Sequence, residues 1–361
     1  MNKFNKNSNA AYLKAALALA KKRRGFCAPN PSVGALVIKN DEVLAEGKHW
    51  AAGEPHAERV ALNKLGKKAK GASLYVTLEP CCHWGKTPPC TQIIIDSGIK
   101  HVYYSLEDPN PEVAGKGAKE LIAAGIQCEQ IKLPEIDSFY RSYIYWMKNH
   151  RPFITAKIAL SLDGKIASVQ GESVQLTGDA LQQLTHQNRR KSDALLTTIN
   201  TIINDDPQMN VRLEEDIIAK PIYILDSHLR LPLNARVFET SSRLTVFHEK
   251  NANEKQKQQL TAKNVRCVEI EKNKDGLRLQ EMINVIGNDG VHDLWVETGA
   301  RCFQSLVKQK LLNRLFIYVA PKILGPEAKS AFDESLPLLD DAKTVQWKSY
   351  DQDAVCLIEY S

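Results

Sequence analysis

Short segments typical of buried β-strands alternate with helix-like segments along the whole chain, and this alternation restricts the fold more than any other feature. The strand-like segments are rich in β-branched and aromatic residues, and the segments between them have the apolar spacing of helices. Such a series predicts parallel or mixed sheets with helices on both faces. In the first part of the chain the expected strands are 33–38, 43–47, 73–78 and 101–106, and the expected helices are 9–22, 55–65 and 91–97.

The chain is too long for a single core. Its 361 residues exceed the length at which one hydrophobic core usually divides. The aromatic segment 137–152 ends in a polar break, and a second, different alternating series follows it. We therefore predict two α/β domains, 1–148 and 149–361. In the second, strands are expected at 153–160, 193–198, 221–227, 244–249, 265–270, 293–299, 314–324, 345–350 and 354–360, and helices at 179–190, 256–263, 276–286 and 301–309.

Composition excludes several classes of protein. Apolar residues make up 43% and charged residues 25% of the chain, as in ordinary globular proteins. No apolar run approaches the ~18 residues of a membrane span, and Tyr12 and Lys14 make the N-terminal segment an amphipathic helix rather than a signal peptide. Eight cysteines without an export signal favour a reduced, cytoplasmic protein. The net charge of +6 is small for a nucleic-acid binder, so we interpret the basic run 21–24 as a solvated helix end rather than an RNA contact.

Two separated motifs supply the ligands of a zinc ion. GEPHAERVAL (53–62) contains His56, and TLEPCCHWGKTPPC (77–90) contains Cys81 and Cys90. One imidazole and two thiolates are a typical donor set for a zinc ion whose fourth position stays open to water. We expect His56 in the first turn of one helix. We expect Cys81 at or just before the start of another, where the helix dipole would stabilise its thiolate.

Glu58, two residues after His56, distinguishes a catalytic zinc from a structural one. Zinc lowers the pKa of a bound water to about 7, and a carboxylate beside it can take the proton and pass it to a leaving amine. The pattern H-x-E followed by P-C…C is the signature of zinc-dependent nucleobase deaminases. A closed structural site is the alternative, because Cys82 or His83 could supply a fourth ligand. That alternative leaves Glu58 without a role.

The spacing between the two cysteines indicates which kind of zinc-dependent deaminase this could be. Eight residues, CHWGKTPP, separate them, whereas ordinary cytidine and adenosine deaminases have two. We expect this insertion to form a loop at the mouth of the pocket, with Lys86 placed to meet an anion.

Five segments together resemble the bifunctional riboflavin biosynthesis deaminase/reductase family, over nearly the whole chain. They are PNPSVGALVIK (29–39), GEPHAE (53–58), YVTLEPCCHWGKTPPC (75–90), DPNPEVAGKG (108–117) and SLDGKIA (161–167). The resemblance implies a cytidine-deaminase-like N-terminal domain of three α/β/α layers and a C-terminal α/β domain like dihydrofolate reductase. It implies zinc-dependent deamination of 2,5-diamino-6-(5-phosphoribosylamino)pyrimidin-4-one. The product, 5-amino-6-(5-phosphoribosylamino)uracil, would then be reduced by NADPH at its ribosyl group, which becomes ribityl.

The resemblance also implies roles for residues of the deaminase half. Asn30 would hydrogen-bond the pyrimidine or sugar, and His49 and Lys86 would lie near the ribose phosphate. Without the resemblance, Asn30 would be a turn residue and His49 could equally be a surface histidine.

The second half has no G-x-G-x-x-G motif, but DLWVETGARCFQSL (293–306) joins a strand through a glycine to a helix, which can seat a phosphate. Arg189 and Arg212 suit a phosphate, with exposed surface arginines as the alternative. The resemblance implies a substrate side formed by Lys157, Ser173, Arg189, Met209, Arg212 and Glu297. It implies a cofactor side formed by Leu160, Gln175, Thr201, Asp205, Ser227, Gly299, Ala300, Arg301, Cys302, Phe303, Gln304 and Ser305.

Two other functions remain open at this point. One is a deaminase of free or tRNA nucleobases with an accessory nucleotide-binding domain, which the long loop between the cysteines disfavours. The other is a zinc-containing nucleotide-binding module without turnover, which Glu58 disfavours. We expect a small phosphorylated pyrimidine as the ligand, no nucleic-acid or membrane partner, and a homo-oligomer, either dimer or tetramer.

Overall fold

The computed structural model describes residues 6–85, 87–111, 113–168, 175–214, 216–273, 276–332, 335–336 and 338–360. Contacts divide the chain into two compact units, residues 1–150 and 151–361, and each is described by itself. No helix in these described ranges is long and apolar enough to cross a membrane.

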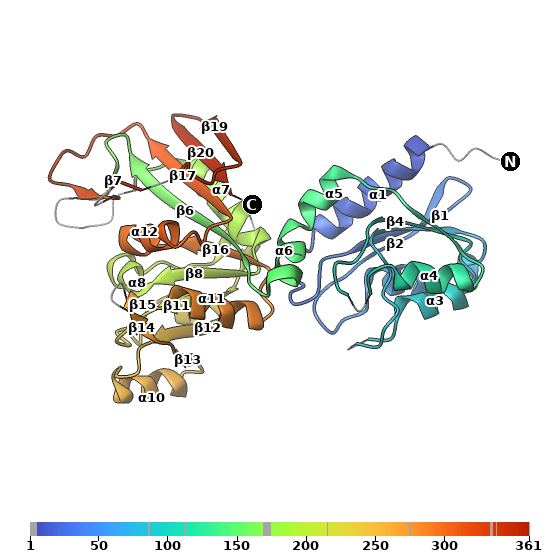
Figure 1. The fold of residues 1–361 in the computed structure, drawn as a ribbon, viewed down its shortest axis with the longest axis horizontal. Coiled ribbons are helices and arrows are strands. Elements are labelled where there is room, and N and C mark those ends of the chain that lie inside the picture. Colours follow the sequence, from blue (N-terminus) through green and yellow to red (C-terminus); the bar gives the residue numbers. More distant parts are fainter. Residues whose placement is uncertain are drawn as a thin grey trace. The chain divides into compact units, whose positions relative to one another are not determined.

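The first unit is built on a five-stranded sheet in the order β2-β1-β3-β4-β5. It is the part of the chain that runs from blue to green in Figure 1. Strand β1 pairs antiparallel with β2 and β3, whereas β3, β4 and β5 are parallel. Because β3 and β4 are parallel neighbours, their carboxyl ends lie together at the same edge of the sheet. The strands are β1 Gly34–Lys39, β2 Glu42–Lys48, β3 Ser73–Leu78, β4 His101–Leu106 and β5 Gln127–Gln130.

Helices cover both faces of this sheet, which gives the three α/β/α layers expected from the sequence. On one face, α1 packs with α5 and α6 over apolar side chains of β1, β3 and β4. On the other face, α2, α3 and α4 bury a second apolar cluster. The helices are α1 Lys6–Lys21, α2 Ala57–Asn63, η1 Gly66–Ala69, α3 Cys90–Asp96, α4 Lys116–Ala123, α5 Pro134–Phe139 and α6 Arg141–Asn149.

Glycines allow two of these helices to approach the sheet closely. A Cβ on Gly47 would lie 1.9 Å from the carbonyl oxygen of Ala57, so only glycine lets α2 pack against β2 at this distance. A Cβ on Gly117 would lie 2.0 Å from the carbonyl oxygen of Pro80, where α4 meets the end of β3. Both contacts fix segments that carry the residues of the predicted metal site.

The second unit is built on a nine-stranded sheet in the order β13-β12-β11-β8-β16-β6-β17-β20-β19. The strands from β13 to β17 in this order are parallel, and β20 and β19 add an antiparallel hairpin at one edge. The strands are β6 Phe153–Ser161, β8 Ala194–Thr198, β11 Lys220–Leu225, β12 Ser241–His248, β13 Arg266–Glu269, β16 Asp293–Glu297, β17 Arg314–Ala320, β19 Thr344–Tyr350 and β20 Asp353–Glu359.

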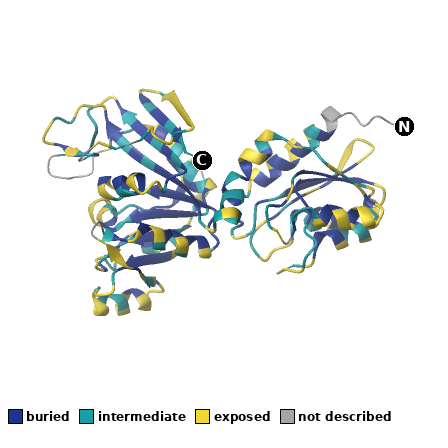
Figure 2. Cartoon of the chain, viewed as in Figure 1, coloured by how far each residue is buried: buried dark blue, intermediate teal, exposed yellow. Residues whose placement is uncertain are grey.

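Two apolar clusters enclose this sheet, and the central strands are buried on both faces (Figure 2). Helices α11 and α12 pack on one face, and α8, α9 and α10 contribute to the cluster on the other. The helices are α7 Asp179–Lys191, α8 Ile199–Asp205, α9 Val237–Thr240, α10 Glu254–Ala262, α11 Leu279–Asn288 and α12 Ala300–Lys308, and the short strands are β7 Lys165–Ala167, β9 Val211–Leu213, β10 Asp216–Ile218, β14 Lys272–Asn273, β15 Gly276–Leu277 and β18 Lys329–Ser330.

Two predicted helices in the chain begin later than expected. The helix predicted from residue 276 begins at Leu279, because Gly276 adopts a φ of +124° and pairs in β15 with β14. The helix predicted from residue 55 begins at Ala57, because His56 has extended backbone angles and is the N-cap. The second difference places His56 in front of the first turn rather than within it.

Candidate metal centre and cavity

Three side chains of the first unit converge as a possible metal site. His56 Nδ1 lies 3.4 Å from Cys81 Sγ and 3.4 Å from Cys90 Sγ. All three atoms lie within 4.8 Å of one another. Ligand atoms around one tetrahedral zinc, with Zn–S bonds of about 2.3 Å, lie about 3.6 Å apart. The donor set and its spacing therefore fit zinc.

Neighbouring helix starts bring these ligands together. Arg59 on α2 donates to the carbonyl oxygen of Pro89, the N-cap of α3, at 3.3 Å, so the segments that carry His56 and Cys90 are linked. The sequence suggested that Cys81 lies at or just before a helix start. This was wrong, because α3 begins only at Cys90. The Cys81 thiol nevertheless accepts a hydrogen bond from the Cys90 backbone N–H at 3.4 Å.

The environment favours deprotonation of one thiol. The hydrogen bond with Cys90 lowers the pKa of Cys81, burial opposes that shift, and the hydrogen bond with His56 lowers the pKa further. Thr87 contacts the other ring nitrogen of His56, with Oγ1 3.2 Å from Nε2. Such a contact fixes the orientation of a ligating imidazole.

Glu58 lies in the first turn of α2 and is 3% exposed. Burial raises the pKa of its carboxyl group. The carboxyl group interacts with His56 and Cys81 and hydrogen-bonds with the Cys90 side chain. It therefore lies beside the three candidate ligands without belonging to the group that could hold the metal, as a proton-transfer group requires.

The alternative fourth ligands do not join the site. Among the described residues, the group that could hold a metal contains His56, Cys81 and Cys90, and it does not include Cys82 or His83. The arrangement therefore leaves room for a non-protein ligand, which is the property of a catalytic zinc site.

Asn30 and His49 lie beside this centre. His49 is 1% exposed, so it is not a surface histidine, and burial lowers its pKa. Asn30 Nδ2 lies 3.3 Å from His49 Nε2, and the His49 ring makes an edge contact with the His56 ring at a centroid distance of 5.3 Å. Lys86 lies outside the described residues.

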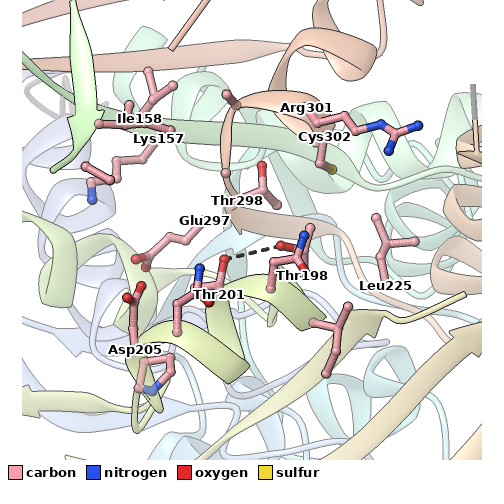
Figure 3. Close-up of a pocket in the computed structure, with 18 of the residues that line it drawn as sticks. Lys157, Ile158, Thr198, Thr201, Asp205, Leu225, Glu297, Thr298, Arg301 and Cys302 are labelled. Atoms are coloured by element: carbon pink, nitrogen blue, oxygen red, sulfur yellow. Dashed lines mark hydrogen bonds between the residues drawn. The ribbon is translucent and has the colours of Figure 1, made fainter. Parts of the chain in front are cut away.

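The second unit contains a cavity of about 900 Å³ at the carboxyl ends of its central strands (Figure 3). Lys157 comes from β6, Glu297 from the end of β16, and Thr198 from the end of β8. Leu225 closes β11. Figure 3 shows Lys157, Glu297 and Asp205 on one side of the cavity and Leu225, Arg301 and Cys302 on the other. Clefts of this size hold cofactors and substrates.

A buried ion pair organises one side of this cavity. Arg189 grips Glu297 with two hydrogen bonds, Nε to Oε1 at 2.6 Å and Nη2 to Oε2 at 3.0 Å. Trp295 Nε1 also donates to Glu297 Oε1 at 2.7 Å. Burial alone would raise the pKa of Glu297, but the Arg189 guanidinium outweighs it and lowers the pKa to about 2.

Lys157 is the other basic group on this side. Its Nζ lies 5.4 Å from the ring centroid of Tyr318. Burial lowers its pKa, and the Glu297 carboxylate opposes that shift. Lys157 is therefore a better proton donor than an ordinary lysine.

The N-terminus of α12 opens into the cavity. Its N-cap is Gly299, without a side-chain cap, and Gly299 lines the cavity. A Cβ added there would meet no protein atom within 4 Å. Uncapped N–H groups beside open space are suited to phosphate oxygens. The cavity thus fits the pyrophosphate of a dinucleotide.

Most of the residues expected to bind substrate or cofactor in the second unit line this cavity. Four do not: Leu160 and Phe303 belong to the apolar core, Gln304 donates to the carbonyl oxygen of Ala331, and Arg212 on β9 bonds Asn210. Ser173 lies outside the described residues. The residues that line the cavity are Lys157, Gln175, Arg189, Met209, Thr201, Asp205, Ser227, Glu297, Gly299, Ala300, Arg301, Cys302 and Ser305.

Several lining residues had no sequence signal of their own. They include Thr198, Asn200, His228, Arg230 and Lys272. Thr198 ends β8 and Asn200 comes two residues later in α8, where polar residues at the end of a buried strand could have indicated a site at the sheet edge. His228 follows β11 and Lys272 lies in β14, and only the strand order brings these segments together.

Known proteins resemble this chain in both units. Residues 6–106 match the cytidine and deoxycytidylate deaminase zinc-binding region, and residues 152–356 match the RibD C-terminal domain. The riboflavin biosynthesis protein RibD of Aquifex aeolicus is 40% identical, over 93% of this chain and 93% of that protein. RibD of Haemophilus influenzae is 38% identical, over 96% of this chain and 95% of that protein. The chain belongs to the RibD family.

Solved structures of RibD proteins have the same fold. RibD of Acinetobacter baumannii matches with a TM-score of 0.85 and 33% identity, over 98% of this chain and 99% of that one. A diaminohydroxyphosphoribosylaminopyrimidine deaminase/5-amino-6-(5-phosphoribosylamino)uracil reductase from Thermotoga maritima matches with a TM-score of 0.83 and 32% identity, over 98% of this chain and 99% of that one. The predicted deaminase-like and reductase-like folds are confirmed.

The ion pair in the reductase cavity leads to a stability prediction. Arg189→Met leaves Glu297 charged and buried, and breaking such a pair costs about 3–5 kcal/mol of the free energy of unfolding. The control is Arg314→Met, which breaks the more exposed pair with Glu359, at 25% and 21% side-chain exposure. We expect that variant to lose about 1 kcal/mol or less. Urea denaturation of both variants measures the difference, and equal losses would contradict it.

Proposed function

We propose that the first unit hydrolyses the amino group at position 2 of 2,5-diamino-6-(5-phosphoribosylamino)pyrimidin-4-one, and that the second unit reduces the ribosyl group of the product with NADPH. The observation that carries the proposal is the joint presence of a three-ligand metal centre with a buried carboxyl group and a cofactor-sized cavity in one chain of the RibD family.

His56, Cys81 and Cys90 hold the zinc ion in this proposal. When bound, zinc acts as a Lewis acid and lowers the pKa of water at its open position. Glu58 is the proton carrier, because its carboxyl group is buried beside the ligands without being one of them. It takes a proton from the attacking water and delivers it to the departing amine, so that water and the amino compound yield the carbonyl product and ammonia.

Asn30 and His49 position the pyrimidine substrate. They lie 3.3 Å apart beside the ring of His56, and their polar atoms suit a ring that carries amino and carbonyl groups. The proposed contact between Lys86 and the ribose phosphate rests on the family resemblance alone.

NADPH supplies a hydride in the second unit, and the chain's own residues place the sugar. Glu297, held by Arg189 and Trp295, is a fixed hydrogen-bond acceptor for a sugar hydroxyl. Lys157 supplies the proton to the sugar oxygen, because its burial favours proton release. Arg189 is already engaged with Glu297 and Asn210, so its part is to hold that carboxylate. The phosphate contact proposed for Arg212 rests on the resemblance.

The remaining cavity residues accept the cofactor in this proposal. The N-terminus of α12, from Gly299 to Cys302, receives the pyrophosphate, and Thr201, Asp205 and Ser227 line the path across the strand ends. The match of residues 152–356 to the RibD C-terminal domain favours this proposal over a nucleobase or tRNA deaminase with an accessory nucleotide-binding domain.

Purified protein tests the reductase half directly. We expect 5-amino-6-(5-phosphoribosylamino)uracil to cause loss of nicotinamide absorbance with NADPH, without any need for deamination. No loss above an enzyme-free control would remove the reductase from the proposal and leave the deaminase untouched.

We also propose a cytoplasmic homo-oligomer. All eight cysteines are free thiols, which supports a reducing compartment. The edge strand β19 exposes Trp347 and Val345, at 66% and 44%, which supports contact with a second copy. Light scattering of the purified protein determines the oligomeric state, and a monomer at micromolar concentration would contradict this part.

A further inference from the structure

The cavity of the second unit has two chemically different ends. It crosses the carboxyl ends of β6, β16, β8 and β11, which are neighbours in the sheet. These parallel strands lie about 4.8 Å apart, so three steps span about 14 Å. Lys157 and Glu297 mark the end at which the sugar would react. Leu225, the last residue of β11, lies on the opposite side of the cavity from Lys157 and Glu297 in Figure 3. The other end is marked by the lining residues that follow β11: Ser227, His228 and Arg230.

A carboxylate holds two basic side chains at this second end. His228 Nδ1 lies 2.7 Å from Glu249 Oε1, and Lys272 Nζ lies 2.9 Å from Glu249 Oε2. His228 and Lys272 line the cavity and are 59% and 51% exposed, whereas Glu249 is 16% exposed and does not line it. The two basic groups therefore face the cavity, and the carboxylate lies behind them.

Arg230 adds a third basic group to the same end. It lines the cavity, and its Nη2 donates to the neutral Asn200 Oδ1 at 2.9 Å. The loop that carries it is fixed, because Asp226 Oδ2 accepts from the Leu231 backbone N–H at 2.9 Å and the Ser227 carbonyl accepts from the Glu249 backbone N–H at 3.1 Å. One carboxylate, Glu249, thus contacts two of the three basic side chains at this end, whereas two basic and two acidic side chains lie together at the other end: Lys157, Arg189, Asp205 and Glu297.

An excess of positive charge in a fixed wall is the recognition chemistry of a phosphate monoester. NADPH differs from NADH by one such phosphate, on the ribose that lies at the opposite end of the cofactor from the nicotinamide. We propose that Lys272, His228 and Arg230 form an anion subsite for this phosphate and thereby select NADPH over NADH. The inference rests on the proposed reductase function, and it assigns the cofactor specificity to residues outside the motifs of the sequence.

The same chemistry could serve the pyrophosphate of the cofactor, so the test separates the two phosphates. Dissociation constants of the full-length protein are measured by titration calorimetry for NADPH, NADH, 2′,5′-ADP and 5′-ADP. The variant is Lys272→Gln, which leaves a polar side chain at this exposed position and removes its charge. The matched control is Lys250→Gln, which removes the same charge next to Glu249 at a residue that does not line the cavity.

We expect Lys272→Gln to weaken NADPH and 2′,5′-ADP about 10-fold or more, since a hydrogen bond between charged groups is lost. NADH and 5′-ADP should change less than about twofold, because the variant leaves the other contacts intact. Lys250→Gln should change none of the four dissociation constants by more than about twofold. We expect His228→Ala and Arg230→Gln, like Lys272→Gln, to weaken binding of NADPH and 2′,5′-ADP more than binding of NADH and 5′-ADP.

Equal weakening of NADPH and NADH, or of 2′,5′-ADP and 5′-ADP, would place the subsite at the pyrophosphate and overturn the proposal. Unchanged binding of all four ligands would also overturn it. A wild-type protein that binds neither dinucleotide would instead contradict the reductase function itself. This outcome is distinguishable, because it is seen in the wild type alone, before any variant is compared.

Discussion

Glu58→Ala abolishes ammonia release while the protein retains one zinc ion per chain. The carboxyl group lies two residues after His56 and is buried, but it is not part of the ligand group. Removing it takes away the carrier that moves a proton from water to the leaving amine. General acid–base groups contribute about 10²–10⁴-fold to rate, and we expect a loss of at least about 10³-fold because one group serves both transfers.

The measurement combines an ammonia assay with metal analysis of the same sample. Glu42→Gln is the control, because it removes an exposed carboxylate on β2 of the same unit, and its deamination rate should be unchanged. Glu58→Ala should still reduce the deaminated compound with NADPH. Deamination at the wild-type rate would show that Glu58 is not the proton carrier. Loss of zinc would show that it is a ligand.

Cys90→Ser has the second large effect, because it removes a metal ligand. Cys90 is fully buried and its Sγ lies 3.4 Å from His56 Nδ1. A serine hydroxyl is a poor substitute for a thiolate on zinc. We expect the zinc content to fall below about a tenth of one ion per chain and deamination to fall to background, as after treatment of the wild type with a chelator. NADPH oxidation with the deaminated compound should persist.

Cys82→Ser is the matched control for this experiment. Cys82 neighbours Cys81 in sequence but is outside the group that could hold the metal, so the variant should keep both zinc and deamination. A loss of zinc in Cys82→Ser would reveal a fourth protein ligand. The site would then be closed, and the catalytic interpretation would be wrong.

The sequence predicted the long strands of both units well, because buried strands carry a strong signal in their own residues, but it missed the short ones, such as β5 Gln127–Gln130. Strands β3 and β4 have the predicted bounds, 73–78 and 101–106. Helix α3, Cys90–Asp96, was also predicted closely, at 91–97, and Pro88 and Pro89 directly precede it, since proline is favoured at the start of a helix. The separate expectation that Cys81 lies at or just before a helix start was wrong, because α3 begins only at Cys90.

The ligand set of the metal could be proposed from sequence because each ligand lies in a short motif with its own chemistry. The basic end of the reductase cavity could not. His228 follows β11, Glu249 follows β12, and Lys272 lies in the short strand β14, so their contacts depend on the parallel order of β11, β12 and β13. The pairing of Arg189 with Glu297 is also a long-range contact, 108 residues apart in sequence. Arg189 was predicted to bind a phosphate, but because of this contact it instead holds the Glu297 carboxylate in place.

The order and stoichiometry of the two reactions test the central claim that one chain deaminates and then reduces. The diamino compound and NADPH are mixed with the protein, and ammonia and nicotinamide absorbance are followed together. The account predicts that ammonia appears first and that one NADPH is consumed for each ammonia released. NADPH consumption that precedes ammonia release, or that proceeds unchanged with Glu58→Ala on the same diamino compound, would contradict it.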